Sequence, residues 1–264
     1  MRHHIIILRA LAVSVALSLI LTGCSTVSGT GRKQFNIMSD QEANSMGMTS
    51  FTQMKGEVPI SNDPNLNAML QRVGNNIAAA VSDELPNAQW EFVVFDSPQA
   101  NAFCLPGGKV GVYTGILPIT KTEEGLAVVI GHEVAHAVAR HGAERVSKQM
   151  AIQAGASILG IALGEKSEQS QKAAQVAYGL TTNLGFALPH DRKQEAEADY
   201  LGLLYMARAG YNPEEAVHFW SRFADYKKQN GGQGTPWFLS THPLDEQRIK
   251  NIMDWLPEAR AEMK

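Results

Sequence analysis

The sequence is poor in cysteine and in long apolar runs. It has two cysteines among 264 residues, which excludes a small disulfide-stapled scaffold. Its 23 lysines and arginines, against 26 aspartates and glutamates, form no basic tract interleaved with aromatics, which argues against a nucleic-acid surface. No apolar run reaches the roughly 20 residues that a membrane-spanning helix requires. We therefore expect a globular domain without a membrane-spanning helix and without bound nucleic acid.

The N-terminus has the features of a secretory signal over residues 1–23. Arg2 and Arg9 precede a short apolar run that ends in small residues. The signal ends in Leu21-Thr22-Gly23 and is followed by Cys24, and these four residues resemble the lipobox of bacterial lipoproteins. This resemblance implies cleavage before Cys24 and attachment of lipid to Cys24. Because serine rather than aspartate follows, we expect an anchor in the outer membrane, facing the periplasm. The alternative is an ordinary signal peptide with a chance cysteine.

Cys104 is the second cysteine. If Cys24 carries lipid, Cys104 has no partner for an intramolecular disulfide, although the periplasm would permit one. We expect Cys104 to be a small buried residue; a reactive thiol is the alternative.

Residues 24–38 are rich in serine, threonine and glycine and predict a lipidated tether. Residues 39–264 then form one domain. Helices are expected to begin near Ser39 and Asp63, to run over Thr122–Lys148 and Arg192–Ala209, and to follow Asn212 and Pro243; strands are expected over Trp90–Phe95 and around a Pro106-Gly107-Gly108 turn. This pattern predicts an α+β, mainly α-helical fold. The hairpin over residues 101–113 could pair with an extended peptide or serve only as scaffold.

One motif carries most of the chemical information. His132-Glu133-Val134-Ala135-His136 places two histidines four residues apart, so that on a helix both imidazoles share a face and can hold one zinc ion. Glu133 is then close enough to act as a base on water activated by the metal. The motif is embedded in apolar residues, and charged groups buried in such a helix need a partner, which a metal supplies.

A third zinc ligand is expected on a later helix. Glu195 and Asp199 are four residues apart and share a face, so Glu195 can bind zinc while Asp199 accepts an N–H from a zinc-bound imidazole. Glu197 points elsewhere on this helix and is expected to make a surface ion pair. Taken alone, these acids could also form a solvated face.

These residues carry a family resemblance. His132-Glu-Val-Ala-His136, Glu195-x-x-x-Asp199 and Ser240-Thr-His-Pro243, in that order, resemble the HtpX/BepA-like zinc metallopeptidases, which include the CAAX prenyl endopeptidases and a mitochondrial inner-membrane protease. Asn101-Ala-Phe, Gly107-Gly108 and Tyr113-Thr-Gly are also similar, and the resemblance covers nearly all of the chain from Ser39.

The resemblance implies a zincin-like (gluzincin) domain with a small sheet or hairpin beside the zinc-binding helix. It implies one Zn²⁺ per chain, bound by His132, His136 and Glu195, with Glu133 as the catalytic acid and base. Arg192 also matches the family, as a structural ion pair. Among the relatives, the lipoproteins without membrane spans are BepA-like periplasmic proteases.

The other histidines have different expected roles. His242 can donate to the oxyanion of a tetrahedral intermediate; in BepA-like relatives the matching histidine can instead occupy the open zinc position and switch the enzyme off, and a capping role is the plain alternative. His141 lies five residues after His136, off the ligand face, and is expected to be exposed. His218 is expected to be structural, and the resemblance assigns His190 no role.

Three functions are compatible with this site. The favoured one is a zinc endopeptidase that cleaves misfolded or misassembled envelope proteins, with the outer-membrane assembly machinery as a possible partner. The second is a zinc-containing, chaperone-like assembly factor with little turnover, against which the intact Glu133 argues. A cell-wall amidase is the third, and the motif order argues against it.

Two later segments have less specific patterns. Residues 151–164 are apolar with small residues at four-residue spacing, but about fourteen residues are too few for a span, so a buried helix is expected and membrane contact is the alternative. Residues 160–190 are long and polar in the middle, which suggests a lid over the site.

Overall fold

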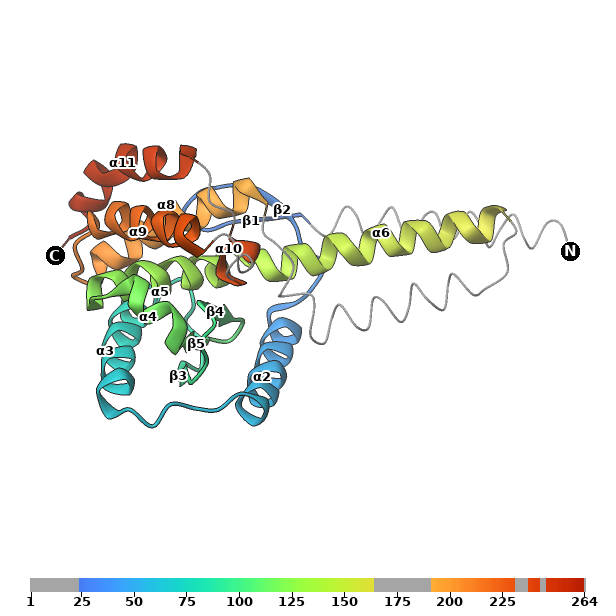
Figure 1. Cartoon of the computed structure of the whole chain (residues 1–264). Coiled ribbons are helices and arrows are strands. Elements are labelled where there is room, and N and C mark those ends of the chain that lie inside the picture. Colours follow the sequence, from blue (N-terminus) through green and yellow to red (C-terminus); the bar gives the residue numbers. More distant parts are fainter. Residues whose placement is uncertain (1–23, 164–190, 231–236, 243–245, 264) are drawn as a thin grey trace, which may run out of the picture.

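The computed structural model describes residues 24–163, 191–230, 237–242 and 246–263 (Figure 1). Their order is β1 (Cys24–Thr26), β2 (Lys33–Phe35), α2 (Asp40–Glu57), α3 (Pro64–Ala80), β3 (Glu91–Phe95), β4 (Ala102–Leu105), β5 (Lys109–Tyr113), a 3₁₀ turn (Thr114–Ile116), α4 (Leu117–Thr120), α5 (Glu123–Val138), α6 (His141–Leu163), α8 (Arg192–Arg208), α9 (Glu215–Asn230), α10 (Trp237–Thr241) and α11 (Glu246–Ala261). The predicted α+β, mainly helical fold is confirmed.

The larger sheet has the order β3-β5-β4. β3 and β5 are parallel, whereas β4 and β5 form an antiparallel hairpin, so β4 is an edge strand of this sheet. Gly107 and Gly108 have φ of 83° and 80° in the turn, a region that favours glycine, as the predicted turn requires. The edge strand β4 packs beside α5.

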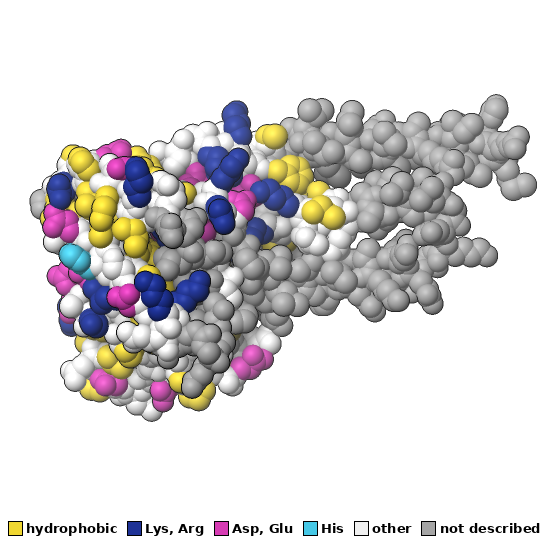
Figure 2. All heavy atoms as spheres, turned by 45° about the horizontal axis from the view of Figure 1, so that its top comes forward, with side chains coloured by type: hydrophobic (Ala, Val, Ile, Leu, Met, Phe, Trp, Pro, Cys, Tyr) yellow, Lys and Arg dark blue, Asp and Glu magenta, His cyan; other side chains and the backbone are white. Residues whose placement is uncertain are grey.

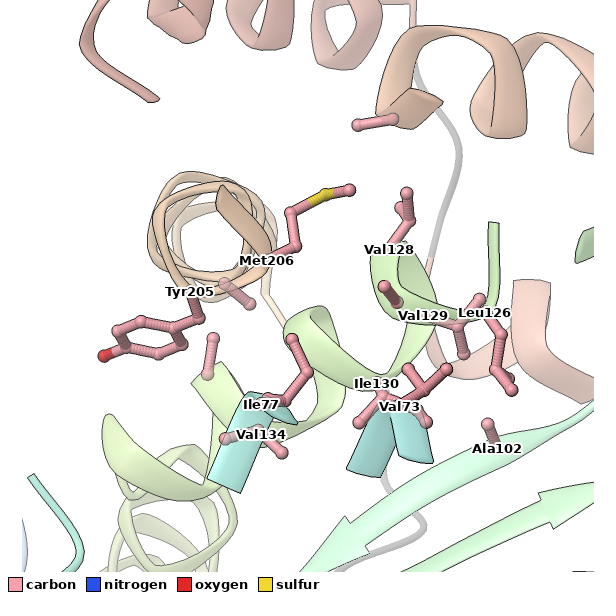
Figure 3. Close-up of a cluster of buried hydrophobic side chains, with 14 of the residues drawn as sticks. Val73, Ile77, Ala102, Leu126, Val128, Val129, Ile130, Val134, Tyr205 and Met206 are labelled. Carbon is pink, nitrogen blue, oxygen red and sulfur yellow. The ribbon is translucent and has the colours of Figure 1, made fainter. Parts of the chain in front are cut away.

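Helix α5 is the centre of the core. In Figure 1 it lies between α8, α9 and α11 on one side and the sheet with α3 on the other. Most of its residues are buried, and each fully buried leucine, isoleucine or valine contributes about 1.5–3 kcal/mol. Figure 3 shows this cluster, which draws on Leu126, Val129, Ile130 and Val134 of α5, Val73 and Ile77 of α3, and Tyr205 and Met206 of α8.

The prediction of one helix from Thr122 to Lys148 is wrong. α5 ends at Val138, and α6 begins at His141 after Arg140 turns to a φ of 55°. Arg140 donates from Nη2 to the Met38 carbonyl at 2.7 Å and forms an ion pair with Asp40 at 2.9 Å. The break thus coincides with contacts to a distant segment, and the residue that takes the positive φ is Arg140 rather than the nearby Gly142.

The prediction of a tether over residues 24–38 is also corrected. β1 and β2 form an antiparallel hairpin in which Cys24 pairs with Phe35. Val27 is buried, and Arg32 donates to Glu197 on α8. Serine, threonine and glycine dominate this segment, but a few larger side chains fix it to the domain.

Of the apolar segment 151–164, the described residues 151–163 belong to α6, which extends away from the body of the molecule (Figure 1). Ile152 is 64% exposed, so the prediction of a buried helix is wrong for the side chains described here. Among the described helices, none combines the length and the apolar character needed to cross a membrane. The expected signal (1–23), most of the expected lid (164–190) and His190 lie outside the described residues.

Candidate metal centre

Two packed helices supply the metal-binding candidates. α5 is capped by Thr122, whose hydroxyl accepts from the Gly125 N–H at 3.0 Å, and it carries His132, Glu133 and His136. α8 is capped by Asp191 and carries Glu195 and Asp199. All five side chains of the site are at most 7% exposed. On the face shown in Figure 2, by contrast, charged side chains of both signs are interspersed with apolar ones.

The helices cross where both have glycine. A Cβ on Gly202 of α8 would lie 2.8 Å from the Gly131 carbonyl carbon and 2.8 Å from the His132 nitrogen of α5. Contacts this short cannot be accommodated without moving one backbone. The two glycines therefore set the helix separation that brings Glu195 to the histidine pair.

Four donor groups converge at one point. His132 Nε2 lies 3.0 Å from His136 Nε2 and 3.5 Å from Glu195 Oε2, and His136 Nε2 lies 3.3 Å from Glu195 Oε1. His242 Nδ1 lies 3.1 Å from His132 Nε2 and 3.0 Å from Glu195 Oε1. A tetrahedral zinc site with bonds near 2.0–2.1 Å has donor separations of roughly 3.3 Å. The distances and the His/Glu chemistry of the donors fit one zinc ion.

The fourth donor, His242, restricts access to this site. Its Nε2 lies 3.2 Å from Glu133 Oε1, so the ring contacts both the other metal-binding candidates and the Glu133 carboxylate. The His242 N–H donates to the Phe238 carbonyl at 2.8 Å, and the two rings have centroids 4.4 Å apart. Both contacts come from α10, a five-residue helix too short for sequence periodicity to predict.

Asp199 lies where a partner for a zinc-bound imidazole is needed. Its Oδ1 is 3.0 Å from His132 Nδ1, which leaves Nε2 free for the metal. Arg248 of α11, which the sequence analysis did not identify, donates from Nη2 to Asp199 Oδ1 at 2.7 Å and forms ion pairs with Asp199 at 2.6 Å and with Glu195 at 3.1 Å. Its guanidinium stacks 3.4 Å from the centroid of the Trp220 ring. Arg248 thus places one positive charge between the Glu195 and Asp199 carboxylates of α8.

The expected exposure of His141 is wrong. The side chain is fully buried, with Nδ1 2.8 Å from His136 Nδ1 and Nε2 2.8 Å from Glu197 Oε2. The helix is interrupted at Arg140, and α6 continues in another direction. The helical spacing that predicted an exposed His141 therefore no longer applies. Burial lowers the pKa of His141 below its usual value, although the hydrogen bond to Glu197 opposes this shift.

The expected ion pair of Glu197 is present, with Arg32, but its expected place at the surface is wrong. Glu197 is 7% exposed and accepts hydrogen bonds from Thr30 and Arg32 of the N-terminal hairpin in addition to His141. Burial alone would raise its pKa, but these donors outweigh burial and lower the pKa to about 2. No local sequence pattern links residues so far apart.

Burial and charge shift the titration of the central groups in opposite directions. Burial raises the pKa of Glu133, whereas at Glu195 the neighbouring charges of His242 and Arg248 overcome burial and hold the pKa well below its usual value. Burial also opposes protonation of His132, but hydrogen bonds to Asp199 and Glu195 raise its pKa to about 9. Burial thus makes the protonated form of Glu133 easier to reach than that of a carboxyl in water.

A cleft of about 790 Å³ opens beside this centre. Glu133, His136 and His242 form part of its wall, and Asn101 and Phe103 of the segment around β4 form another part. Cys104 also lines the cleft, and the residue is only partly buried. Shielding of its thiol from water raises the pKa of that thiol. The edge strand and the metal-binding helix therefore face one cavity.

The comparisons with known proteins agree with this geometry. Residues 64–256, which include every metal-binding candidate, match the model of peptidase family M48. The mitochondrial metalloendopeptidase OMA1 of Schizosaccharomyces pombe is 34% identical over 232 residues, 88% of this chain and 66% of the relative. OMA1 of Saccharomyces cerevisiae is 40% identical over 179 residues, 66% of this chain and 49% of the relative.

A bacterial relative is more distant. The putative beta-barrel assembly-enhancing protease of Vibrio cholerae is 29% identical over 203 residues, 74% of this chain and 40% of the relative. The chain thus spans about two thirds of the length of one of these curated relatives and about half or less of the others.

Proposed function

Because this chain belongs to peptidase family M48, we propose that it is a zinc-dependent endopeptidase that hydrolyses peptide bonds of misfolded or misassembled cell-envelope proteins. The observation that carries the proposal is the position of Glu133. Its carboxylate lies beside a donor set that matches a tetrahedral zinc site and in the wall of an open cleft. His₂Glu is one of the three-ligand sets of catalytic zinc sites, where the fourth position serves the reaction.

Each residue of the site has a defined task. His132, His136 and Glu195 would hold the metal, and Asp199 orients the His132 ring through Nδ1. Bound zinc would act as a Lewis acid and lower the pKa of water in the site to about 7. Glu133 accepts the proton of the attacking water and returns it to the leaving amine, a contribution of roughly 10²–10⁴ in rate.

The edge strand suggests how a substrate is presented. β4 pairs with β5 on one side only, and its residues share the cleft with Glu133. An extended peptide can add to such an edge through main-chain hydrogen bonds, whatever its sequence. Extended segments are available in unfolded chains and not in folded ones, which favours misfolded proteins as substrates.

His242 supports a resting state with low turnover. In the arrangement described above it occupies the fourth corner of the donor set and contacts Glu133, which leaves no room for the scissile carbonyl. A shift of α10 would open the site. The same observation favours the second candidate, a chaperone-like assembly factor that holds clients and cleaves them slowly.

The location of the protein in the cell is a proposal that rests on Cys24 and on the bacterial relatives. Cys24 is exposed at the start of β1, accessible to lipid attachment. Proteins named beta-barrel assembly-enhancing protease occur in Vibrio cholerae and Yersinia pestis among the relatives, although others are mitochondrial. We propose a lipid anchor in the outer membrane, with the domain in the periplasm and the assembly machinery of that membrane as partner.

Lipid anchoring is tested by replacing each cysteine. In a Gram-negative host, Cys24→Ser should move the protein from the outer-membrane fraction to the soluble or unprocessed fraction, whereas Cys104→Ser should not. The readout is fractionation with metabolic labelling by a fatty acid. Equal labelling of wild type and Cys24→Ser would refute the anchor.

The substrate class is tested with one outer-membrane β-barrel protein in two states. The purified chain should cleave the unfolded form and spare the form folded in detergent, and Glu133→Gln should cleave neither. Products are identified by mass spectrometry. Cleavage of both states at equal rates would contradict the preference for unfolded chains, and binding of the unfolded form without any Glu133-dependent cleavage would favour the assembly factor.

A further inference from the structure

A chain of hydrogen bonds leads from a metal-binding histidine to the N-terminal hairpin. His136 Nδ1 contacts His141 Nδ1 at 2.8 Å, His141 Nε2 contacts Glu197 Oε2 at 2.8 Å, and Arg32 Nε donates to the same oxygen at 2.6 Å. Thr30 donates to the other oxygen of Glu197. The path joins α5, α6, α8 and the β1–β2 connection, and every atom of His141 is buried.

One arrangement of protons satisfies the whole path. A neutral His136 that binds zinc through Nε2 carries its hydrogen on Nδ1 and donates it to His141 Nδ1. His141 then carries its own hydrogen on Nε2 and donates it to the Glu197 carboxylate. That carboxylate accepts from Thr30 and Arg32 as well, so its charge is compensated within the hairpin contact.

The Arg32 guanidinium also contacts a second carboxylate, that of Glu144. Its Nη2 donates to Glu144 Oε2 at 3.0 Å, and Glu144 also accepts from Gln194 at 2.8 Å and pairs with Lys148. Gly29 of the same connection approaches Leu201 of α8. These contacts fix the position of the guanidinium and, through it, the Glu197 carboxylate.

We propose that Arg32 and Thr30 of the N-terminal hairpin are positioning residues of the metal centre, which act through Glu197 and His141 on the zinc ligand His136. The proposal rests on the zinc site proposed above and extends it to residues outside the 64–256 match. Carboxylates that orient a ligand histidine change metal affinity by about 10–100-fold when they are altered. The segment that we expect to carry the lipid therefore also completes the metal centre.

The test compares two arginines in similar settings. Arg208 of α8 is 29% exposed and bridges Glu84 and Glu262, as Arg32, 25% exposed, bridges Glu144 and Glu197. Zinc dissociation constants of the full chain are measured by chelator competition. Arg32→Gln should weaken zinc binding at least about tenfold, and Arg208→Gln should leave it within about twofold. The thermal unfolding of the zinc-free variants should change by similar amounts.

Two additional measurements separate positioning from a general loss of structure. Co²⁺ bound in place of zinc should show altered visible absorption in Arg32→Gln and an unchanged spectrum in Arg208→Gln. Thr30→Val keeps the side-chain volume and should weaken zinc binding in the same direction even if Arg32→Gln does not fold. Equal zinc affinities of wild type, Arg32→Gln and Thr30→Val would overturn the inference alone, whereas a wild type that binds no zinc would overturn the proposed function with it.

Discussion

The contacts of His242 bear most directly on turnover at the proposed site. Its Nδ1 stands at the fourth corner of the donor set, where a water or a substrate carbonyl would have to enter. A second contact, from Nε2 to Glu133, ties it to the acid–base group. A histidine in this position limits turnover until it moves away, whereas a histidine that donates only to an oxyanion would raise it.

The first prediction concerns His242→Ala. If the open form is at most about a tenth of the population, removal of the ring should raise casein cleavage at least about tenfold. The exposed His218→Ala on α9 serves as control and should cleave like the wild type. A loss of about 10²–10³ in rate would instead identify His242 as the oxyanion donor.

Glu144 gives a prediction on pH. Burial would raise its pKa, but hydrogen bonds from Arg32, Lys148 and Gln194 prevail and lower it from 4.5. A carboxyl with a depressed folded pKa stabilises the protein above its unfolded pKa, and this contribution is lost as pH falls through the folded value. Glu144→Gln should therefore cost about 1–3 kcal/mol at pH 6, and the difference from wild type should shrink below pH 4.5.

Denaturant unfolding at several pH values measures this effect. Glu57→Gln, an exposed glutamate at the end of α2, should show a small difference from wild type that does not change in the same way. A Glu144→Gln difference that stays constant down to pH 3 would show that the ion pairs around Glu144 do not stabilise the fold.

At the scale of single residues the sequence is informative where spacing is local. His132 and His136, or Glu195 and Asp199, share a helix face by their separation alone, and the structure brings both pairs together with His242. The sequence does not reveal the burial of His141 and Glu197 or the contacts of Arg248. Their partners are more than forty residues away in sequence or beyond a helix break. No periodicity carries such information.

At the scale of elements, the crossing of α5 and α8 determines the geometry of the site. Gly202→Ala would place a methyl group 2.8 Å from the α5 backbone at Gly131 and His132. Overpacking of this kind costs about 1–3 kcal/mol, and the forced separation should also weaken zinc binding. Gly56→Ala on α2, where a Cβ meets nothing within 4 Å, should instead stabilise the protein by about 0.5–1 kcal/mol.

Both variants are compared by thermal unfolding and by zinc affinity. We expect Gly202→Ala to lower both the unfolding temperature and the zinc affinity. Gly56→Ala should leave the zinc affinity unchanged. If Gly202→Ala bound zinc like the wild type, the close approach of the helices would not be needed for the metal centre.

The element boundaries show which signals a sequence contains. The capping box at Ser39, the Asp63 cap and the Thr122 cap are local hydrogen-bond patterns, and each begins a helix as predicted. The end of α5 is different, because Arg140 leaves the helix while its side chain bonds to Met38 and Asp40. The composition of residues 24–38 predicts a tether, and this prediction is wrong. A few long-range contacts fix the segment to the domain although many of its residues are small and polar.

At the scale of the whole molecule, segments from both ends of the described chain close on the α5–α8 pair. The N-terminal hairpin reaches Glu197, and α11 delivers Arg248 to Asp199 and Glu195. Around the metal centre the N-terminal hairpin and α11 are therefore joined to the α5–α8 pair of the domain. Zinc that binds only the folded state should stabilise all of it together, by about 4 kcal/mol at a thousandfold excess over its dissociation constant.

The most direct test of the central claim is cleavage of unfolded casein with zinc content measured on the same samples. Wild type and His242→Ala are each compared with the matching Glu133→Gln protein, so that a resting block by His242 does not hide the chemistry. We predict one zinc per chain in all four proteins and loss of cleavage, by at least about 10², wherever Glu133 is replaced. Folded protein without zinc, or undiminished cleavage in the Glu133→Gln variants, would contradict the central claim.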